Sequence, residues 1–266
     1  MTPTPATPRR LAVVLVDGLR ADTARRFMGF FLALEEAGRA RWSTLRCELP
    51  SLSRPLYATV ISGRRPLEHG IVSNEQHGVR CDDTLFDDVD ALGKTSAVAA
   101  YDWFYELLAG VRFDPSRHRS AACAERGVAA GSWYFEDEYP DSHLIADAED
   151  LRRRVEPDLL FVHPMGVDNA GHAHGGASPG YDLAARKLDM ALATIVPAWL
   201  ALGHDVVLTS DHGMNADRMH GGGATEEREV PFVWVPCGDD ATRAPAHWPT
   251  SQLGIRRFLV SRLHAA

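Results

Sequence analysis

The sequence predicts an α/β protein with a doubly wound, mostly parallel sheet flanked by helices. Short apolar runs rich in β-branched residues, such as Leu11–Val16 and Val206–Leu208, are typical of strands buried on both faces. These runs alternate with segments of helical length, and this alternation is the pattern of a doubly wound sheet. Polar residues follow several of the runs directly, at the strand ends where such sheets bind ligands.

Length and composition indicate one globular domain. Of the 266 residues, 45% are hydrophobic and 24% are charged, which is ordinary for a chain with a single large core. Residues 1–10 are rich in Pro and Thr, and we expect them to be disordered. Residues 11–266 contain no long polar linker, and we expect them to form a single domain.

The charge and the apolar runs bear on partners and location. A net charge of −8 argues against a nucleic-acid-binding surface, although bound divalent cations would still allow an anionic substrate. No run approaches the roughly 18 apolar residues of a membrane span, and Leu11–Val16 is too short for a signal peptide. The four cysteines lack metal-ligand spacing. We therefore expect a cytoplasmic protein that binds a small molecule, with neither a membrane nor a nucleic-acid polymer as partner and with an oligomeric state that the sequence leaves open.

The first half of the chain predicts strands and helices in turn. After the first strand, a helix capped by Asp22 or Thr23 should run to about Ala37. Ser51 and Ser53 precede another helix, where a serine can serve simply as the N-cap. The remaining expectations are an extended segment over 41–49, a helix from Pro55 through Ile61, a helix over 84–92 and a strand over 95–101.

The second half repeats this alternation. The aromatic residues within 101–105 are more typical of core than of a pocket. Residues 163–176 are rich in Gly and His and predict a loop, and Pro197 predicts a kink in a long helix. The expected elements are a helix over 144–155, a strand over 158–162, a helix over 180–202, a strand over 205–209, a strand over 230–235 and a helix over 251–264.

Three apolar strands are followed by acids or imidazoles that could meet at one edge of the sheet. Carboxylate oxygen and imidazole nitrogen together suit zinc or a similar divalent ion. One Asp-His pair alone could equally cap a turn, but the recurrence favours ligands. Six such groups would repel one another without cations, and two divalent ions would make the cluster tolerable. The residues are Asp17, Asp168, His172, Asp211, His212 and, in a Gly-rich loop, His220.

These residues resemble the alkaline phosphatase superfamily, in its nucleotide pyrophosphatase/phosphodiesterase branch (type I phosphodiesterase-like). The resemblance extends from about Leu11 to Pro236, and it lies in the joint order and spacing of short motifs. It implies that residues 11–266 form a single alkaline-phosphatase-like catalytic domain. The large insertions of several relatives are missing, so we expect no large cap domain. The motifs are Asp17–Gly18, Pro50–Pro55, Ser62–Gly63, Pro66–Asn74, Asp168–His172, Ser210–Met214 and His220–Gly221.

The resemblance also implies roles for individual residues. Ser53 corresponds to the nucleophile, where many relatives have Thr, and Asn74 to an asparagine that binds a phosphoryl oxygen. One metal site would hold Asp168, His172 and His220. The other would hold Asp17, Asp211, His212 and the oxygen of Ser53. Zinc is the usual ion of this branch, with manganese as the alternative.

Two positions depart from the family pattern. Where relatives have aromatic residues that sandwich a nucleobase, this chain has Arg54 and His163. Arg54 could grip a phosphate with two hydrogen bonds, or it could cover the helix surface. We therefore treat Arg54 and His163 as candidate substrate-binding residues, and simple nucleobase stacking is in doubt.

The sequence thus predicts a metal-dependent phosphoester hydrolase. A phosphodiesterase or nucleotide pyrophosphatase that forms a phosphoserine with the help of two divalent ions is favoured. The alternative is a phosphomonoesterase acting on a small phosphorylated metabolite or nucleotide, since Arg54 would suit a doubly charged phosphate. A mutase would need a large inserted domain, and a binding protein without turnover would not need a complete nucleophile and ligand set.

Overall fold

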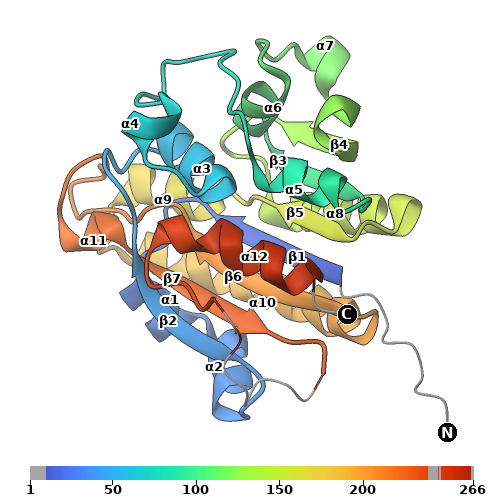
Figure 1. The fold of residues 1–266 in the computed structure, drawn as a ribbon. Coiled ribbons are helices and arrows are strands. Elements are labelled where there is room, and N and C mark those ends of the chain that lie inside the picture. Colours follow the sequence, from blue (N-terminus) through green and yellow to red (C-terminus); the bar gives the residue numbers. More distant parts are fainter. Residues whose placement is uncertain (1–9, 239–244, 246, 265–266) are drawn as a thin grey trace, which may run out of the picture.

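A seven-stranded sheet forms the centre of the molecule in a computed structural model that describes residues 10–238, 245 and 247–264 (Figure 1). The strand order is β2-β7-β6-β1-β5-β3-β4. The strands are β1 (Arg10–Val16), β2 (Arg41–Arg46), β3 (Ser96–Tyr101), β4 (Val128–Tyr134), β5 (Leu159–Val162), β6 (His204–Ser210) and β7 (Glu229–Val235).

The sheet is mostly parallel, as predicted. β6, β1, β5, β3 and β4 run in one direction, and β7 runs against both β6 and β2. Val14 of β1 lies opposite Val162 of β5 on one side and Leu208 of β6 on the other. Because these three strands are in register, the residues that follow them lie at the same edge of the sheet.

Helices cover both faces of the sheet (Figure 1). One face is covered by α3 (Ser53–Ser62), α5 (Leu85–Ala91), α6 (Asp102–Ala109) and α12 (Ile255–His264). The other is covered by α1 (Ala21–Phe27), α2 (Gly29–Glu36), α8 (Asp141–Val155), α9 (Gly166–His174) and α10 (Pro179–Ala201). Short helices lie in the connections: α4 (Pro66–His69), α7 (Pro115–His118), η1 (Ala124–Arg126), α11 (Thr225–Arg228) and η3 (Gln252–Gly254).

The central strand β1 shows why the core has two layers. Leu11, Val13 and Leu15 pack into the layer with α3 and α12, whereas Val14 and Val16 pack into the layer with α10. All of them are fully buried. Alternation along a strand sends neighbouring side chains to opposite faces, so a continuous apolar run is needed where both faces are covered. None of the described helices is long and apolar enough to span a membrane.

The structure corrects several predicted boundaries. Arg10 belongs to β1 and not to a disordered terminus, while residues 1–9 lie outside the described part of the chain. The first helix begins at Ala21 with Arg20 as its N-cap, so neither Asp22 nor Thr23 caps it, and it is interrupted at Met28. Strand β4 and helix α6 were not predicted.

The predicted loop over 163–176 is also wrong, because residues 166–174 form helix α9. Gly and His are poor helix formers, so tertiary contacts must hold this helix. Asp141 accepts a hydrogen bond from the N–H of Gly166 at 3.1 Å. Gly171 packs so closely on Met214 that an added Cβ would lie 2.7 Å from the Met214 methyl carbon. This helix carries two of the predicted ligands.

Candidate active site

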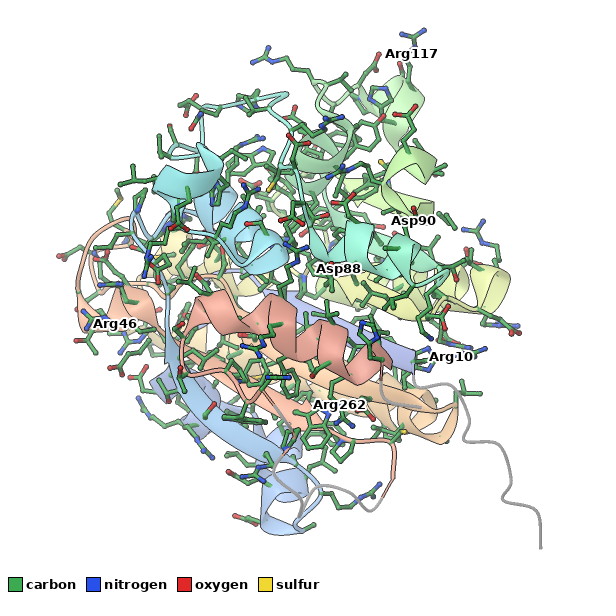
Figure 2. The ribbon with its side chains drawn as sticks, viewed as in Figure 1. Arg10, Arg46, Asp88, Asp90, Arg117 and Arg262 are labelled. Atoms are coloured by element: carbon green, nitrogen blue, oxygen red, sulfur yellow. The ribbon has the colours of Figure 1, made fainter. Side chains whose placement is uncertain are left out.

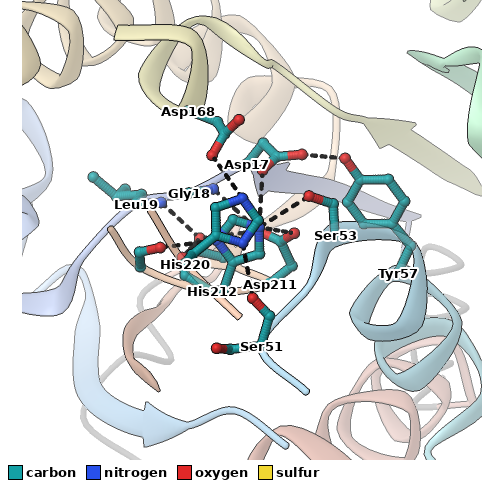
Figure 3. A network of polar contacts seen from close by, with 12 residues as sticks. Asp17, Gly18, Leu19, Ser51, Ser53, Tyr57, Asp168, Asp211, His212 and His220 are labelled. Atoms are coloured by element: carbon teal, nitrogen blue, oxygen red, sulfur yellow. Dashed lines mark hydrogen bonds and ion pairs between the residues drawn. The ribbon is translucent and has the colours of Figure 1, made fainter. Parts of the chain in front are cut away.

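The six predicted ligands meet at the carboxyl edge of the parallel strands. Figure 3 labels five of them, Asp17, Asp168, Asp211, His212 and His220. Asp17 follows β1, and Asp211 and His212 follow β6. Asp168 and His172 lie one turn apart on α9, which follows β5. His220 comes from the loop before α11. The in-register ends of β1, β5 and β6 therefore bring together groups that are far apart in sequence.

Asp17, Asp211 and His212 form the first of two clusters of ligand atoms, all within 4.8 Å of one another. The Nε2 atom of His212 lies 3.4 Å from Oδ1 of Asp17 and 3.3 Å from Oδ2 of Asp211. All three side chains are fully buried. This cluster can offer two carboxylate oxygens and one imidazole nitrogen to a single cation.

The second cluster consists of Asp168, His172 and His220. The Nε2 atom of His172 lies 3.3 Å from Oδ2 of Asp168 and 3.2 Å from Nε2 of His220. The ring of His220 stacks on that of His212 with 3.7 Å between the centroids, so the two clusters are adjacent. The His172 side chain is 45% exposed, and the second cluster therefore reaches the surface.

Each histidine of the clusters presents Nε2 to its neighbours and turns Nδ1 towards a backbone carbonyl. His172 contacts the oxygen of Arg218 at 3.0 Å, His212 that of Gly213 at 2.9 Å, and His220 that of Ser51 at 2.8 Å. A carbonyl oxygen only accepts, so Nδ1 carries a proton, and in the neutral imidazole Nε2 keeps its lone pair. This is the arrangement that orients imidazole ligands of metals in proteins.

The carboxylates are oriented in a similar way. One oxygen of each contacts a neighbouring polar group, and the other has no hydrogen-bond partner. Oδ2 of Asp17 accepts a hydrogen bond from the hydroxyl of Tyr57, and Oδ1 of Asp211 accepts one from the N–H of Gly18 at 3.1 Å. Oδ1 of Asp17, Oδ1 of Asp168 and Oδ2 of Asp211 are buried without a hydrogen-bond partner. Buried acceptors of this kind are rare and costly. Their presence in both clusters fits two divalent cations.

Gly18 makes this close packing of acids feasible. Its φ is +67°, a conformation that favours glycine, and an added Cβ would lie 2.6 Å from Oδ1 of Asp168. Any larger residue would push Asp168 away from the carboxyl edge. The motif that places Gly18 after Asp17 therefore serves the geometry of both clusters.

The pKa values of the three carboxyl groups are also consistent with bound cations. Burial raises the pKa of Asp211 and of Asp168, and the negative charge of Asp17 raises both further. Burial alone would also raise the pKa of Asp17, but hydrogen bonds and charge from His163, His212 and Tyr57 lower it to about 2. The chain alone therefore disfavours three ionised carboxylates, whereas nearby cations would favour them.

Ser53 does not cap its helix. It is the first residue of α3, the N-cap is Leu52, and the N-cap makes no side-chain hydrogen bond. The hydroxyl of Ser53 donates to Nε2 of His212 across 3.0 Å, so Ser53 touches the first cluster. The hydroxyl of Ser51 instead bonds Gly221 and Gly222 and so holds the loop of His220.

Asn74 lies beside the first turn of α3, which begins at Ser53. Its Oδ1 accepts a hydrogen bond from the backbone N–H of Arg54 at 3.0 Å, and Arg54 is the residue next to Ser53. Because Oδ1 is engaged in this way, the amide nitrogen of Asn74 is the part of the side chain left to donate to a ligand.

Arg54, a candidate substrate-binding residue, points into the protein and has partners there. Its side chain is fully buried, and its guanidinium forms an ion pair with Glu106 at 2.8 Å. The Nε atom donates to the backbone oxygen of Asn74 at 2.9 Å, and Nη2 donates to Nδ1 of His77 at 3.0 Å. The sequence could not show this because Glu106 is 52 residues away.

His163, the other candidate substrate-binding residue, is likewise fully buried. Its Nε2 lies 3.4 Å from Oδ2 of Asp17, and its ring packs against Tyr57 and Phe104. It therefore lies behind Asp17 and supports that carboxylate. The sequence prediction also missed Tyr57, which lies four residues after Ser53 and so one turn further along the same helix.

The fold and the site place the chain in the alkaline phosphatase superfamily, among enzymes that act on phosphoesters. A sequence model of the family "Type I phosphodiesterase / nucleotide pyrophosphatase" matches residues 11–222, and the chain belongs to this family.

Known relatives are distant and longer. Human GPI ethanolamine phosphate transferase 1 is 25% identical over an alignment of 266 positions. The alignment covers 89% of this chain and 27% of the relative. The structure of murine ectonucleotide pyrophosphatase/phosphodiesterase 5 is similar with a TM-score of 0.60 and 18% identity, over 78% of this chain and 58% of that one. Phosphonoacetate hydrolase from Sinorhizobium meliloti is similar with a TM-score of 0.54 and 24% identity, over 77% and 57% respectively. At these identities the solved structures show the fold.

Proposed function

We propose that this chain cleaves phosphodiesters through Ser53 with the help of two divalent ions, zinc being the expected ion. The observation that carries the proposal is the contact of the Ser53 hydroxyl with Nε2 of His212, at 3.0 Å. It joins a nucleophile to a buried cluster of ligand atoms that lacks positive charge.

The two clusters would hold the ions as the sequence analysis expects. Asp17, Asp211 and His212 would hold one ion next to Ser53. The cluster of Asp168, His172 and His220 would hold the other. When bound, a pair of divalent ions stabilises a serine alkoxide and the charge that develops on the attacking and leaving oxygens.

The residues of the chain then perform a two-step transfer. Ser53 gives its hydroxyl proton to solvent, and its Oγ forms a bond to phosphorus while the bond from phosphorus to the leaving oxygen breaks. The leaving oxygen takes a proton from water. Asn74 donates an amide hydrogen to a nonbridging oxygen, and the N-terminus of α3 favours the negative charge there. In the second step a water oxygen bonds to phosphorus, the bond to Oγ breaks, and Ser53 recovers a proton.

The burial of Arg54 favours a diester over a monoester. The monoesterase alternative relied on the Arg54 guanidinium to bind a second negative charge on the phosphate. That guanidinium is paired with Glu106 and faces away from solvent. A singly charged phosphodiester therefore suits the site better.

A second candidate is transfer to an alcohol instead of water. The human relative is named as an ethanolamine phosphate transferase, and its similarity covers 89% of this chain. The first step at Ser53 would be the same, and an acceptor hydroxyl would replace water in the second. Both candidates share one substrate class, a small-molecule phosphodiester.

Trapping the covalent intermediate tests the proposal directly. Zinc-loaded protein is mixed with bis-p-nitrophenyl phosphate and quenched in acid, and peptides are analysed by mass spectrometry. We expect a phosphoester on Ser53 and a higher rate with this diester than with p-nitrophenyl phosphate. The control is Ser62→Ala, which alters a hydroxyl at the other end of α3 and should leave the adduct unchanged. Turnover without any adduct on Ser53 would refute the mechanism.

The acceptor can be identified in the same assay. We expect the substrate to yield p-nitrophenyl phosphate in water. If ethanolamine or glycerol is added and the chain is a transferase, a mixed diester should accumulate in proportion to the alcohol. No mixed diester at high alcohol concentration would rule out the transferase candidate and leave hydrolysis.

A further inference from the structure

We propose that Arg54 is a positioning residue that fixes Asn74 beside the nucleophile. Arg54 acts without touching the substrate. The inference rests on the proposed function, because it assigns to the Asn74 amide the task of binding a phosphoryl oxygen next to Ser53.

Arg54 holds Asn74 at two points. Its backbone N–H donates to Oδ1 of Asn74 at 3.0 Å, and its Nε donates to the backbone oxygen of Asn74 at 2.9 Å. The first bond sets the orientation of the side-chain amide, because a flipped amide would place its NH2 group against another donor. The second bond fixes the backbone. Since Arg54 directly follows Ser53, both bonds tie Asn74 to the position of the nucleophile.

The guanidinium is itself held rigidly. Nη1 donates to Oε2 of Glu106 at 2.8 Å, and the exposed fractions of the two side chains are 0% and 4%. The guanidinium carbon lies 4.3 Å from the centroid of the Trp103 ring. Any other rotamer of Arg54 would leave a buried carboxylate without its partner, which is strongly unfavourable.

Glu106 also binds directly to the loop that carries Asn74. Oε2 also accepts the N–H of Gly78 at 3.1 Å, and Oε1 accepts the N–H of Phe113 at 2.9 Å. The loop that carries Asn74 is therefore fastened to α6 at Gly78 and to α3 at Arg54. This explains why an ion pair is buried here: it sets the distance between a loop and the nucleophile helix.

A second buried group of arginine, carboxylate and tryptophan lies at the amino edge of the sheet and can serve as a matched control. Arg262, labelled in Figure 2, lies on α12. It pairs with Asp205 at 3.1 Å, and its guanidinium carbon lies 4.6 Å from the centroid of the Trp234 ring. The exposed fractions of the Arg262 and Asp205 side chains are 10% and 1%. This group also consists of an arginine, a carboxylate and a tryptophan, with Asp in place of Glu, but it lies near the beginning of β6, away from Ser53.

A double-mutant cycle tests the inference. The variant Arg54→Gln/Glu106→Gln removes both charges, so no unpaired charge remains buried. We expect it to lower kcat/KM on bis-p-nitrophenyl phosphate by about 10- to 100-fold, no more than Asn74→Ala does, since one donor to a developing charge typically contributes about 100- to 1,000-fold. When combined with Asn74→Ala, it should add less than about 2-fold, because coupled residues are not additive.

Two further variants separate positioning from simple loss of stability. Arg54→Lys keeps a charge for Glu106 and should fold, but it should recover only part of the activity because an ammonium lacks the planar fork. Arg262→Gln/Asp205→Asn should lower the melting temperature and leave kcat/KM of the folded protein within about 2-fold of wild type. Additive losses in the cycle, or wild-type kcat/KM in Arg54→Gln/Glu106→Gln, would overturn the inference.

Binding of inorganic phosphate, measured by calorimetry on zinc-loaded Ser53→Ala protein, gives a readout other than turnover. The neutral pair Arg54→Gln/Glu106→Gln should weaken phosphate binding by a factor similar to that of Asn74→Ala. If Asn74→Ala changes neither binding nor turnover, the role assigned to Asn74 under the proposed function is wrong. If Asn74→Ala matters and the neutral pair does not, the role assigned to Arg54 alone is wrong.

Discussion

Acidic residues lie at both edges of the parallel strands, and the two sets have different partners. At the amino edge, Asp158 accepts from Nζ of Lys94 and from the N–H of Thr95, both at 3.0 Å. Asp205 pairs with Arg262 at 3.1 Å and accepts from Nε1 of Trp234 at 3.1 Å.

At the carboxyl edge, Asp17, Asp168 and Asp211 lie among one another and among imidazoles, and each keeps one buried oxygen without a partner. The acids of the amino edge are neutralised by the chain itself and contribute to stability. Those of the carboxyl edge leave a need for positive charge that the protein does not meet. The comparison therefore separates acids that the chain pairs internally from acids that keep a buried oxygen without a hydrogen-bond partner.

The largest effect is expected at Ser53. Ser53→Ala removes the nucleophile but leaves the carboxylates and imidazoles in place, so kcat should fall by about 10,000-fold or more. The free energy of unfolding should change by less than about 1 kcal/mol, since no buried charge is exposed. Steady-state kinetics and urea unfolding measure the two quantities. A variant with near-wild-type kcat would move the nucleophile elsewhere.

At the amino edge we expect a loss of stability without a loss of activity. Asp205→Asn removes the charge that compensates Arg262, and breaking a buried pair costs about 3–5 kcal/mol of unfolding free energy. At a temperature where the variant is folded, kcat/KM should stay within about 2-fold of wild type. Urea unfolding and kinetics on the same sample check this. A large loss of kcat without loss of stability would show that the two edges are not separate in function.

A smaller effect is expected at Asp102, which follows β3 at the carboxyl edge. Burial, with the nearby charge of Glu106, raises the pKa of Asp102 to about 7, and the Arg54 cation offsets only part of this. Between about pH 4 and pH 7 the unfolded chain releases this proton while the folded protein keeps it, so stability falls as the pH rises.

Asp102→Asn removes this dependence on pH. The variant should match wild type at pH 4 and exceed it at pH 8 by about 1–2 kcal/mol, since one pKa unit is worth about 1.4 kcal/mol and partial exposure screens some of it. Urea unfolding at the two pH values measures the difference. A stability difference that is the same at both would mean that Asp102 ionises normally.

The same comparison shows which parts of the fold and of the site could be predicted from the sequence. The apolar runs over 11–16 and 206–208 predicted buried strands, and parallel strand ends meet at one edge, so the gathering of Asp17, Asp211 and His212 there was accessible. Their assignment to one metal site came from the family resemblance. Helix α9 could not be predicted from the sequence, because Gly and His are weak helix formers and its contacts with Asp141 and Met214 are tertiary.

The direction of the Arg54 side chain was also beyond the sequence. Residue 54 directly follows the nucleophile, which suggested a contact with substrate. The guanidinium turns inward because Glu106 and Trp103, from a helix that the sequence did not predict, provide a buried carboxylate and a ring face. Strand β4 was missed for a related reason, since Val128–Tyr134 contains Ala, Gly and Ser, which are weak strand formers.

The most direct test of the central claim is the number of divalent ions bound at the carboxyl edge. Protein stripped with a chelator and dialysed against zinc should contain close to two ions per chain by elemental analysis. Asp211→Ala should lose at least one of them, whereas Asp205→Asn should keep both. No zinc above background in protein that remains active would contradict the account, and so would equal stoichiometry in wild type and Asp211→Ala.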